Sequence, residues 1–346
     1  MPVVIRPGNG AADQASAITL FSRHLNPAYD TERFDWLYRR NPAGSGRLWI
    51  AEDSGTGEIV GTAGAFPRLF SIDGEDVQGW TLGDFCVAER YRALGPALKL
   101  QRACLAPEPG AIDTFRYDFP SDAMMTVYRR LGIAPVGQLR RFVKLLRVDR
   151  ALERVTPWPV LNLPIQGALN ALLRLHDLPT RRPRGVALAI HDGPFGEEFS
   201  RLFDAQRAQY GICAKRTAEF LEWRYGQNPV EAHSTLTARR LGRLIGYAVF
   251  TRRGDAAAIS DLFGVPEPEV LRGLVRRVAA IARERGDTNL SMSILDTHPW
   301  AEMLRGLGFV AREGHPLIWC VGESADRRAT DRKLDHGLFM SGDRDS

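Results

Sequence analysis

The sequence predicts a mixed α/β protein of two tandem domains, each a mostly antiparallel sheet flanked by helices. Three short patterns occur twice, in the same order and at similar separations. Ordered internal similarity of this kind indicates a duplicated domain. The matched pairs are W-x-Y-x-x-N-P from Trp36 and from Trp223, Val60-Gly61 with Ile245-Gly246, and Leu131-Gly132 with Leu307-Gly308.

The repeats set the expected domain boundaries. We expect a first domain over residues 1–146 and a second over 186–322. The linker at 147–185 is interrupted by prolines and has apolar residues at helical spacing from Ile165 to Leu173, which predicts a short amphipathic helix. Residues 323–346 are polar, and we expect an irregular tail with a short apolar anchor at 338–340.

Composition restricts the class of protein. The 346 residues are 44% hydrophobic with a net charge of +5, but only four of the 46 basic residues are lysine and the arginines are scattered. This distribution disfavours a nucleic-acid partner. Four widely separated cysteines and seven dispersed histidines indicate reduced thiols, no metal site and a cytoplasmic location. No apolar run is long enough to predict a membrane span.

Within each copy we expect a helix, a hairpin of strands, a further strand and then helix, strand, helix and strand. In the first copy "LWIAEDSGTGEIVGTAGAF" predicts strand, turn and strand, so the glycines at 55–61 belong to a hairpin turn. Their spacing and position do not fit a dinucleotide-binding loop, and no G-x-x-x-x-G-K-[ST] phosphate loop is present.

The stretch after the next strand carries the strongest functional signal. "WTLGDFCV" predicts a buried strand, and "AERYRALGPAL" leads from it into a helix. Gly95 allows close approach to the backbone, and Pro96 suits a first helical turn because it has no N–H to leave unpaired. Free N–H groups at a helix start bind anions, and Arg92 adds a fixed positive charge. The pattern therefore predicts an anion site, most simply for a pyrophosphate.

This arrangement resembles the GCN5-related N-acetyltransferase family. The resemblance rests on R-x-x-G-x-A after a strand, followed later by a helix that carries "YRRLGI", and it covers residues 1–145 well and 186–320 in outline. It implies acyl transfer from acetyl-CoA to an amine by direct attack, without a metal. The acceptor, a small-molecule or peptide amine, is not identified by the sequence, and neither is the oligomeric state.

The resemblance also implies roles for single residues. Tyr128 would protonate the departing thiolate. Apart from the resemblance, Asp84 on the strand before the loop is a candidate base, directly or through water. The pantetheine arm of the coenzyme would lie beside Phe85, Cys86 and Val87. The pyrophosphate would be surrounded by Arg92, Ala93, Leu94, Gly95 and Ala97.

Other interpretations remain open for these residues. Tyr128 has apolar neighbours at helical spacing and could be a core residue, and Asp84 could be a solvated strand end. Cys86 is better explained as a small buried residue than as a nucleophile. The W-x-Y-x-x-N-P motifs either pack the helix that covers each sheet or line a cleft between the copies.

The second copy departs from the family pattern. It has no R-x-x-G-x-A after its corresponding strand, and Met303 or Leu304 stands where Tyr128 is expected. We therefore expect it to have lost the coenzyme site. Two other classes stay open for the whole chain. One is a Fem-type transferase that uses aminoacyl-tRNA, and the other is a non-catalytic coenzyme-binding or scaffold protein with the same fold.

Overall fold

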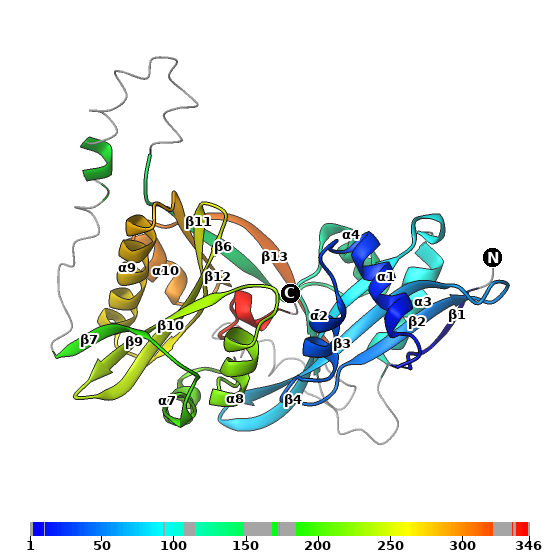
Figure 1. Cartoon of the computed structure of the whole chain (residues 1–346), viewed down its shortest axis with the longest axis horizontal. Coiled ribbons are helices and arrows are strands. Elements are labelled where there is room, and N and C mark those ends of the chain that lie inside the picture. Colours follow the sequence, from blue (N-terminus) through cyan, green and yellow to red (C-terminus); the bar gives the residue numbers. More distant parts are fainter. Residues whose placement is uncertain are drawn as a thin grey trace, which may run out of the picture.

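The computed structural model describes residues 3–9, 11–92, 94–106, 115–148, 168–171, 173, 185–320, 334 and 337–344. Within these residues, thirteen strands join in one mixed sheet with helices packed on it, which confirms the predicted fold class (Figure 1). Most of the linker predicted at 147–185 and most of the tail at 323–346 lie outside the described residues. Residues 168–171, inside the predicted linker helix, are helical.

Most of the first half of the chain forms one end of the sheet, on the right in Figure 1, whereas its last strand lies among strands of the second half. Its strands are β1 (Val3–Pro7), β2 (Arg47–Asp53), β3 (Ile59–Ile72), β4 (Glu75–Val87), β5 (Phe115–Asp118) and β6 (Gly137–Leu145). Its helices are α1 (Gln14–His24), α2 (Thr31–Tyr38), α3 (Leu94–Leu105) and α4 (Asp122–Arg130). The initial strand β1 was not expected from the sequence.

The second half follows nearly the same order at the other end of the sheet. Its strands are β7 (Val186–His191), β8 (Ile212–Ala214), β9 (His233–Arg240), β10 (Arg243–Arg253), β11 (Ala256–Gly264), β12 (Asn289–Leu295) and β13 (Val310–Cys320). Its helices are α7 (Glu197–Gln206), α8 (Ala218–Leu221), α9 (Pro268–Glu284) and α10 (Trp300–Gly306). The short β8 lies apart from the others and pairs with β3 of the first half.

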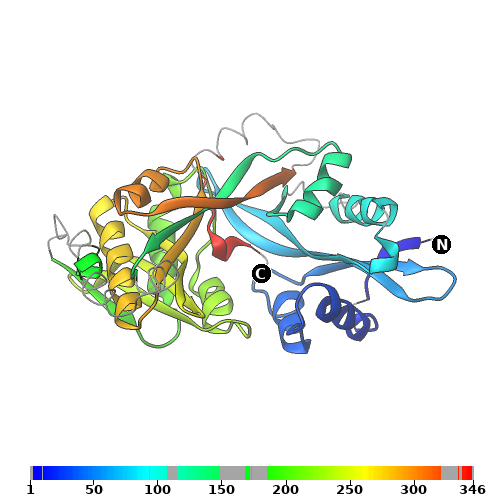
Figure 2. The ribbon, with the colours of Figure 1, turned by 90° about the horizontal axis from the view of Figure 1, so that it is seen from above.

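The two halves exchange their last strands. The strand order is β1-β2-β3-β4-β5-β13-β6-β12-β11-β10-β9-β7, so β13 lies between β5 and β6. Figure 2 shows β13, in orange, crossing from the second half to the first. Residues 318–320 of β13 pair with β5, and β6 pairs along its length with β12. Each half therefore depends on a strand that the other half supplies.

The two copies of the W-x-Y-x-x-N-P motif meet between the halves. The rings of Trp36 and Trp223 stack with centroids 4.9 Å apart. Each indole N–H donates to the backbone carbonyl of the other tryptophan, at 2.9 and 3.0 Å. Both side chains are buried, so these bonds are shielded from water. The motif residues are thus packed core residues, as the first interpretation held, and the two tryptophans pack against each other where the halves meet.

A C-terminal segment lies in the same place, in red in Figures 1 and 2. Residues 338–340 are fully buried, which confirms the expected apolar anchor. The carboxylate of Asp343 accepts hydrogen bonds from Arg68 of β3 at 2.8 Å and from Arg216 of the second half at 3.1 Å. Arg216 also pairs with Asp261 of β11. One carboxylate near the end of the chain therefore connects both halves.

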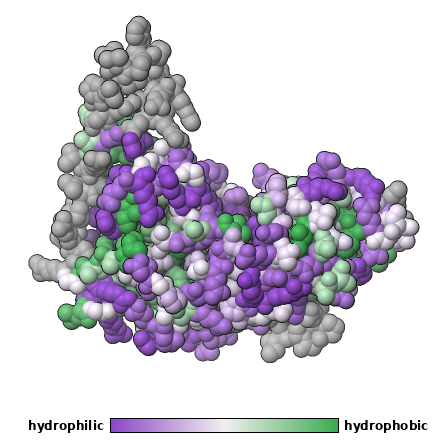
Figure 3. Space-filling model, in the orientation of Figure 1, coloured by the Kyte–Doolittle hydropathy of each residue, from purple (hydrophilic) through white to green (hydrophobic). Residues whose placement is uncertain are grey.

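The surface seen in Figure 3 is mostly hydrophilic, with small separate apolar areas. Among the described helices, none is both long and apolar enough to cross a membrane.

Candidate active site

The central strands of the first half separate and leave a gap. The strands β4 and β5 are parallel and pair over residues 79–81 and 115–117. Beyond this ladder β5 ends at Asp118, whereas β4 continues to Val87. A cavity of about 840 Å³ lies at the gap, lined by residues 82–87 on one side and by residues 118–121 on the other. The backbone of β4 along this wall is thus available to an extended ligand.

A bulge in β4 places Asp84 on the cavity wall. The register with β3 shifts between Thr62 and Gly64, and Asp84 has a positive φ of 45°. A non-glycine residue in this region is strained, and such strain concentrates at functional sites. The Thr62 hydroxyl donates to the Asp84 carbonyl oxygen at 3.0 Å and fixes the bulge. Asp84 is thus a rigid cavity residue, in contrast to a solvated strand end.

Two tyrosines hold the side chain of Asp84. The hydroxyls of Tyr29 and Tyr38 donate to its Oδ2 atom at 2.6 and 3.1 Å. Burial and the nearby Asp84 charge raise the pKa of Tyr38 well above its ordinary value, so this tyrosine stays protonated. Two O–H donors on one oxygen fix the carboxylate orientation at the cavity, where it can accept a further proton or bind a cation.

Two residues of the predicted anion site, Arg92 and Ala97, line the same cavity, whereas Gly95 does not. Arg92 is exposed, and its Nε donates to the carbonyl of Val87 at 3.2 Å. A Cβ at Gly95 would meet no atom within 4 Å, so the first turn of α3 is open to a ligand. Leu94 begins the helix, and Ala93 lies outside the described residues.

Tyr128 lies behind the cavity wall. Its side chain is fully buried, and its hydroxyl donates to Asp118 at 2.7 Å and accepts from Gln101 at 3.0 Å. Both of these partners line the cavity, whereas Tyr128 does not. Burial and the Asp118 charge raise the pKa of Tyr128 well above its ordinary value. The tyrosine is thus both a core residue and one hydrogen bond away from the cavity lining.

The remaining predicted residues line the β4 side of the cavity. Phe85 is half-buried among apolar side chains of α3 and α4, and Val87 is buried. Cys86 is buried, and this burial raises the pKa of its thiol to about 12. The thiol therefore stays protonated near neutral pH, which agrees with the interpretation of Cys86 as a packing residue.

Sequence reasoning missed the residues that complete the cavity from other elements. Asp118 stands at the carboxyl end of a parallel strand, a position where polar residues often form sites, so it could have been found. The lining residues from the α1–α2 connection and from the C-terminal segment belong to no local sequence motif, so the sequence did not predict them. The missed lining residues include His24, Asn26, Tyr29, Arg33, Gln101, Asp118, Ser121, Met124 and Arg344.

The second half has a corresponding gap between parallel strands, but different residues surround it. Its parallel pair β11–β12 covers residues 256–259 and 289–292. A cavity of about 590 Å³ nearby is lined by Tyr210, His298, Trp300 and the proline-rich start of α9. Asp261 occupies the strand position that matches Asp84, but it is buried and paired with Arg216. In this half the carboxylate is therefore neutralised by an ion pair.

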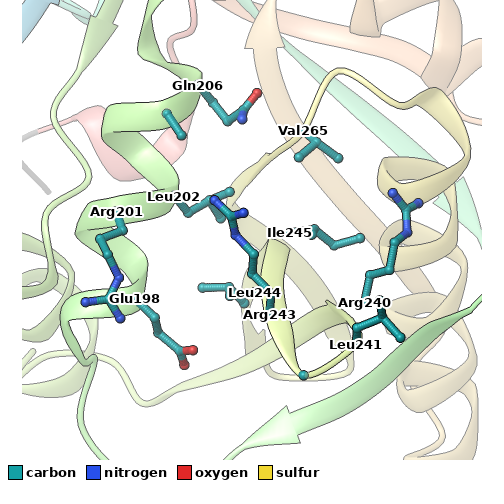
Figure 4. Close-up of a pocket in the computed structure, with 12 residues that line it drawn as sticks. Glu198, Arg201, Leu202, Gln206, Arg240, Leu241, Arg243, Leu244, Ile245 and Val265 are labelled. Carbon is teal, nitrogen blue, oxygen red and sulfur yellow. The ribbon is translucent and has the colours of Figure 1, made fainter.

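A further cavity, of about 920 Å³, lies between α7 and the turn from β9 to β10 (Figure 4). Two of its four charged lining residues are paired, because Arg240 binds Glu267 at 2.6 Å and Glu198 binds Arg239. No strand separation or bulged carboxylate opens into it among the residues that line it. Within the described residues, no group of three or more His, Cys, Asp or Glu is placed to hold a metal ion.

Comparison with known proteins identifies the fold. Neither a protein-family model nor a curated protein matches the sequence. A GCN5-related N-acetyltransferase from Anabaena variabilis is similar, with a TM-score of 0.62 and 12% identity over 92% of this chain and 72% of its own. A conserved Enterococcus faecalis protein, described as a probable N-acyltransferase, gives 0.62 and 11% over 93% and 72%.

Saccharomyces cerevisiae N-myristoyltransferase with bound myristoyl-CoA is also similar. Its TM-score is 0.56, with 13% identity over 92% of this chain and 83% of that enzyme. At these identities the similarity concerns the fold alone. The chain therefore has the fold of the GCN5-related N-acetyltransferases, as the sequence predicted.

Proposed function

We propose that the protein is an N-acyltransferase that moves an acetyl group from acetyl-CoA to an amine in the cavity between β4 and β5. One observation carries the proposal: a strained, bulged Asp84 lies in a strand gap that Arg92 and Ala97, from the loop before α3 and its first turn, also line. A gap with free strand backbone suits the extended pantetheine arm, and a helix start suits its pyrophosphate. The bound myristoyl-CoA of the yeast neighbour supports a coenzyme A thioester as the donor.

In this proposal the coenzyme extends from α3 into the gap. Arg92 and the backbone at 93–97 hold the pyrophosphate, with Gly95 leaving room above the first turn. The absent N–H of Pro96 removes one possible donor from this site. The pantetheine lies along residues 85–87 of β4, which line the cavity. The thioester then reaches the region of the bulge.

The chemistry requires a neutral amine. A lysine-like ammonium has a pKa of about 10.4, so a nearby base or a desolvating wall must assist its loss of a proton. Asp84 takes this proton directly or through water. The amine nitrogen attacks the thioester carbonyl carbon, whose oxygen is polarised by backbone N–H groups of β4. The C–S bond breaks, and the departing thiolate takes up a proton. Tyr128, which is hydrogen-bonded to Asp118 and Gln101 of the cavity lining, is the proposed source of that proton.

We propose that the second half arose by duplication and no longer binds the coenzyme. Three observations support this. The two halves have nearly the same order of helices and strands. Asp261 forms an ion pair with Arg216. The sequence before α9 contains no R-x-x-G-x-A motif. The second half then acts as a wall of the acceptor side and as the source of β13.

The test is a binding titration with acetyl-CoA, followed by thiol release with a panel of amines. Gly95→Glu places a bulky negative group where the pyrophosphate lies and is expected to weaken binding by at least about tenfold, through lost charge-assisted hydrogen bonds. Gly95→Ala is the matched control, because its Cβ enters open space and alanine favours a helix. Equal acetyl-CoA affinity in wild type and a folded Gly95→Glu variant would remove the site assignment.

The panel also separates the proposal from its competitors. Absence of acetyl-CoA binding, with acylation that depends on aminoacyl-tRNA, would identify a Fem-type transferase. Coenzyme binding without turnover of any amine would favour a non-catalytic binding protein.

A further inference from the structure

A second cavity adjoins the proposed acyl-transfer site on the side of the second half. Its volume is about 360 Å³, and we refer to it as the inter-half cavity. It is enclosed by α2, by the Arg224–His233 region of the second half and by the C-terminal segment. Arg33 and Arg344 line both this cavity and the cavity beside Asp84. A ligand at Asp84 can thus extend past these two arginines into the space between the halves.

The inter-half cavity is strongly cationic. Four arginines line it, against one carboxylate, that of Glu231. Arg253 already binds Glu231, at 2.9 Å for one of its two contacts. Arg224 donates to the backbone carbonyl of Arg344 at 2.8 Å and so helps to hold the C-terminal segment in place. The positive charges of Arg33 and Arg344 are not balanced by the carboxylate in the lining.

Buried nitrogen atoms in this lining have no acceptor. The Nε atoms of Arg33 and Arg344 are both buried and meet no hydrogen-bond partner within the described part of the chain. Buried polar groups in proteins are nearly always satisfied, and an unsatisfied donor is destabilising. A ligand in the cavity would therefore meet the terminal N–H groups of Arg33 and Arg344, whose Nε atoms are shielded from it.

The geometry points to an acceptor amine that also carries a carboxylate, which Arg33 and Arg344 bind in the inter-half cavity while the amine lies beside Asp84. The guanidinium group presents paired N–H donors that match the two oxygens of a carboxylate. The ring of Tyr29 lies 4.8 Å from the guanidinium carbon of Arg33, which limits the positions that this side chain can take. Tyr29 also donates to Asp84, so one tyrosine links the two ends of the proposed acceptor site. This inference rests on the proposed function and specifies its substrate class as amino acids and related amino carboxylates.

The test compares matched amines with and without the carboxylate. Lysine is compared with cadaverine and phenylalanine with phenethylamine, and thiol release gives kcat/KM for each. Charge-assisted hydrogen bonds predict that each amino acid exceeds its decarboxylated partner by about tenfold or more. Arg33→Met and Arg344→Met are expected to reduce this ratio toward one. Arg39→Gln, which removes the same charge at an exposed position outside both cavities, is expected to keep it.

Calorimetry gives a second readout, because the amino acid should bind the wild-type enzyme with coenzyme A present and bind the Arg33→Met variant more weakly. Acylation of amines at equal rates with and without the carboxylate would overturn this inference and leave the proposed function intact. A preference for phosphoethanolamine over ethanolamine, with none for the amino acids, would overturn the carboxylate assignment. Absence of acetyl-CoA binding would overturn the proposed function, and this inference with it.

Discussion

Replacement of Tyr128 by phenylalanine separates a catalytic role from a structural one. The change removes a single hydroxyl that donates to Asp118 at 2.7 Å and accepts from Gln101 at 3.0 Å. The ring itself is fully buried and its packing is retained. Loss of the hydroxyl leaves buried polar partners with one bond fewer, which is expected to lower the free energy of unfolding by about 1–3 kcal/mol.

The kinetic expectation is larger. A positioned general acid contributes on the order of 10²- to 10⁴-fold in rate, or about 3 to 5 kcal/mol in the barrier. If Tyr128 protonates the departing thiolate, kcat should fall within this range. Coenzyme affinity should be unchanged, because Tyr128 does not line the cavity. Steady-state thiol release, calorimetric titration of acetyl-CoA and denaturant unfolding measure the three quantities separately.

Tyr117→Phe is the matched control. Tyr117 is also fully buried, and its hydroxyl donates to the backbone carbonyl of Asp343 at 2.8 Å. Neither residue lines the Asp84 cavity, but the next residue, Arg344, does, so the comparison of kcat uses an acceptor amine without a carboxylate. It should lose similar stability and keep its kcat. A kcat for Tyr128→Phe within about threefold of wild type, well below the span of general-acid catalysis, would refute the acid role and leave Tyr128 as a core residue.

Three other predictions concern the base, the ion network and the strand exchange. Asp84→Asn keeps an acceptor for its tyrosine partners and tolerates the positive φ, so the fold should persist while kcat falls by roughly 10²- to 10⁴-fold; unchanged turnover would exclude Asp84 as the base. Asp343→Asn leaves two buried arginines without their shared carboxylate and should cost about 3–5 kcal/mol in unfolding free energy. Asp76→Asn, at a half-exposed pair, should cost about 0–1 kcal/mol, and equal losses would contradict the assigned role of the network. Expression of residues 1–146 alone should give an aggregating product by size-exclusion chromatography, because β6 loses β12 and β13; a monomeric, active fragment would disprove this dependence.

The part of the site that sequence could predict is local. A strand followed by Gly95, Pro96 and a helix is a short-range signal, since backbone freedom and the missing proline N–H act within one turn. The anchor at 338–340 was predictable for a related reason, because an apolar run inside a polar tail has to be buried. Neither prediction depended on which distant residues these segments contact in the folded protein.

The remainder of the site depends on contacts between distant segments. The sequence contains Asp84, but its positive φ results from a register shift against β3, which no local pattern encodes. Arg33 and Arg344 are separated by most of the chain and come together only because the C-terminal segment lies between the halves. The repeated tryptophans revealed the internal similarity, yet their mutual hydrogen bonds required the folded arrangement.

The matching aspartates give a physical reason why the proposed reaction would be confined to one of the two gaps. Asp84 and Asp261 occupy corresponding strand positions, and each accepts a hydrogen bond from a buried tyrosine hydroxyl. Asp84 faces the cavity, whereas Asp261 is bound by Arg216, which in turn binds Asp343 of the C-terminal segment. A carboxylate that neutralises a buried arginine is not free to take a proton from an amine, because the arginine would then lose its counter-ion. In the proposed duplication, the second aspartate thus stabilises the junction between the halves, and that same junction positions Arg344 at the acceptor side of the first.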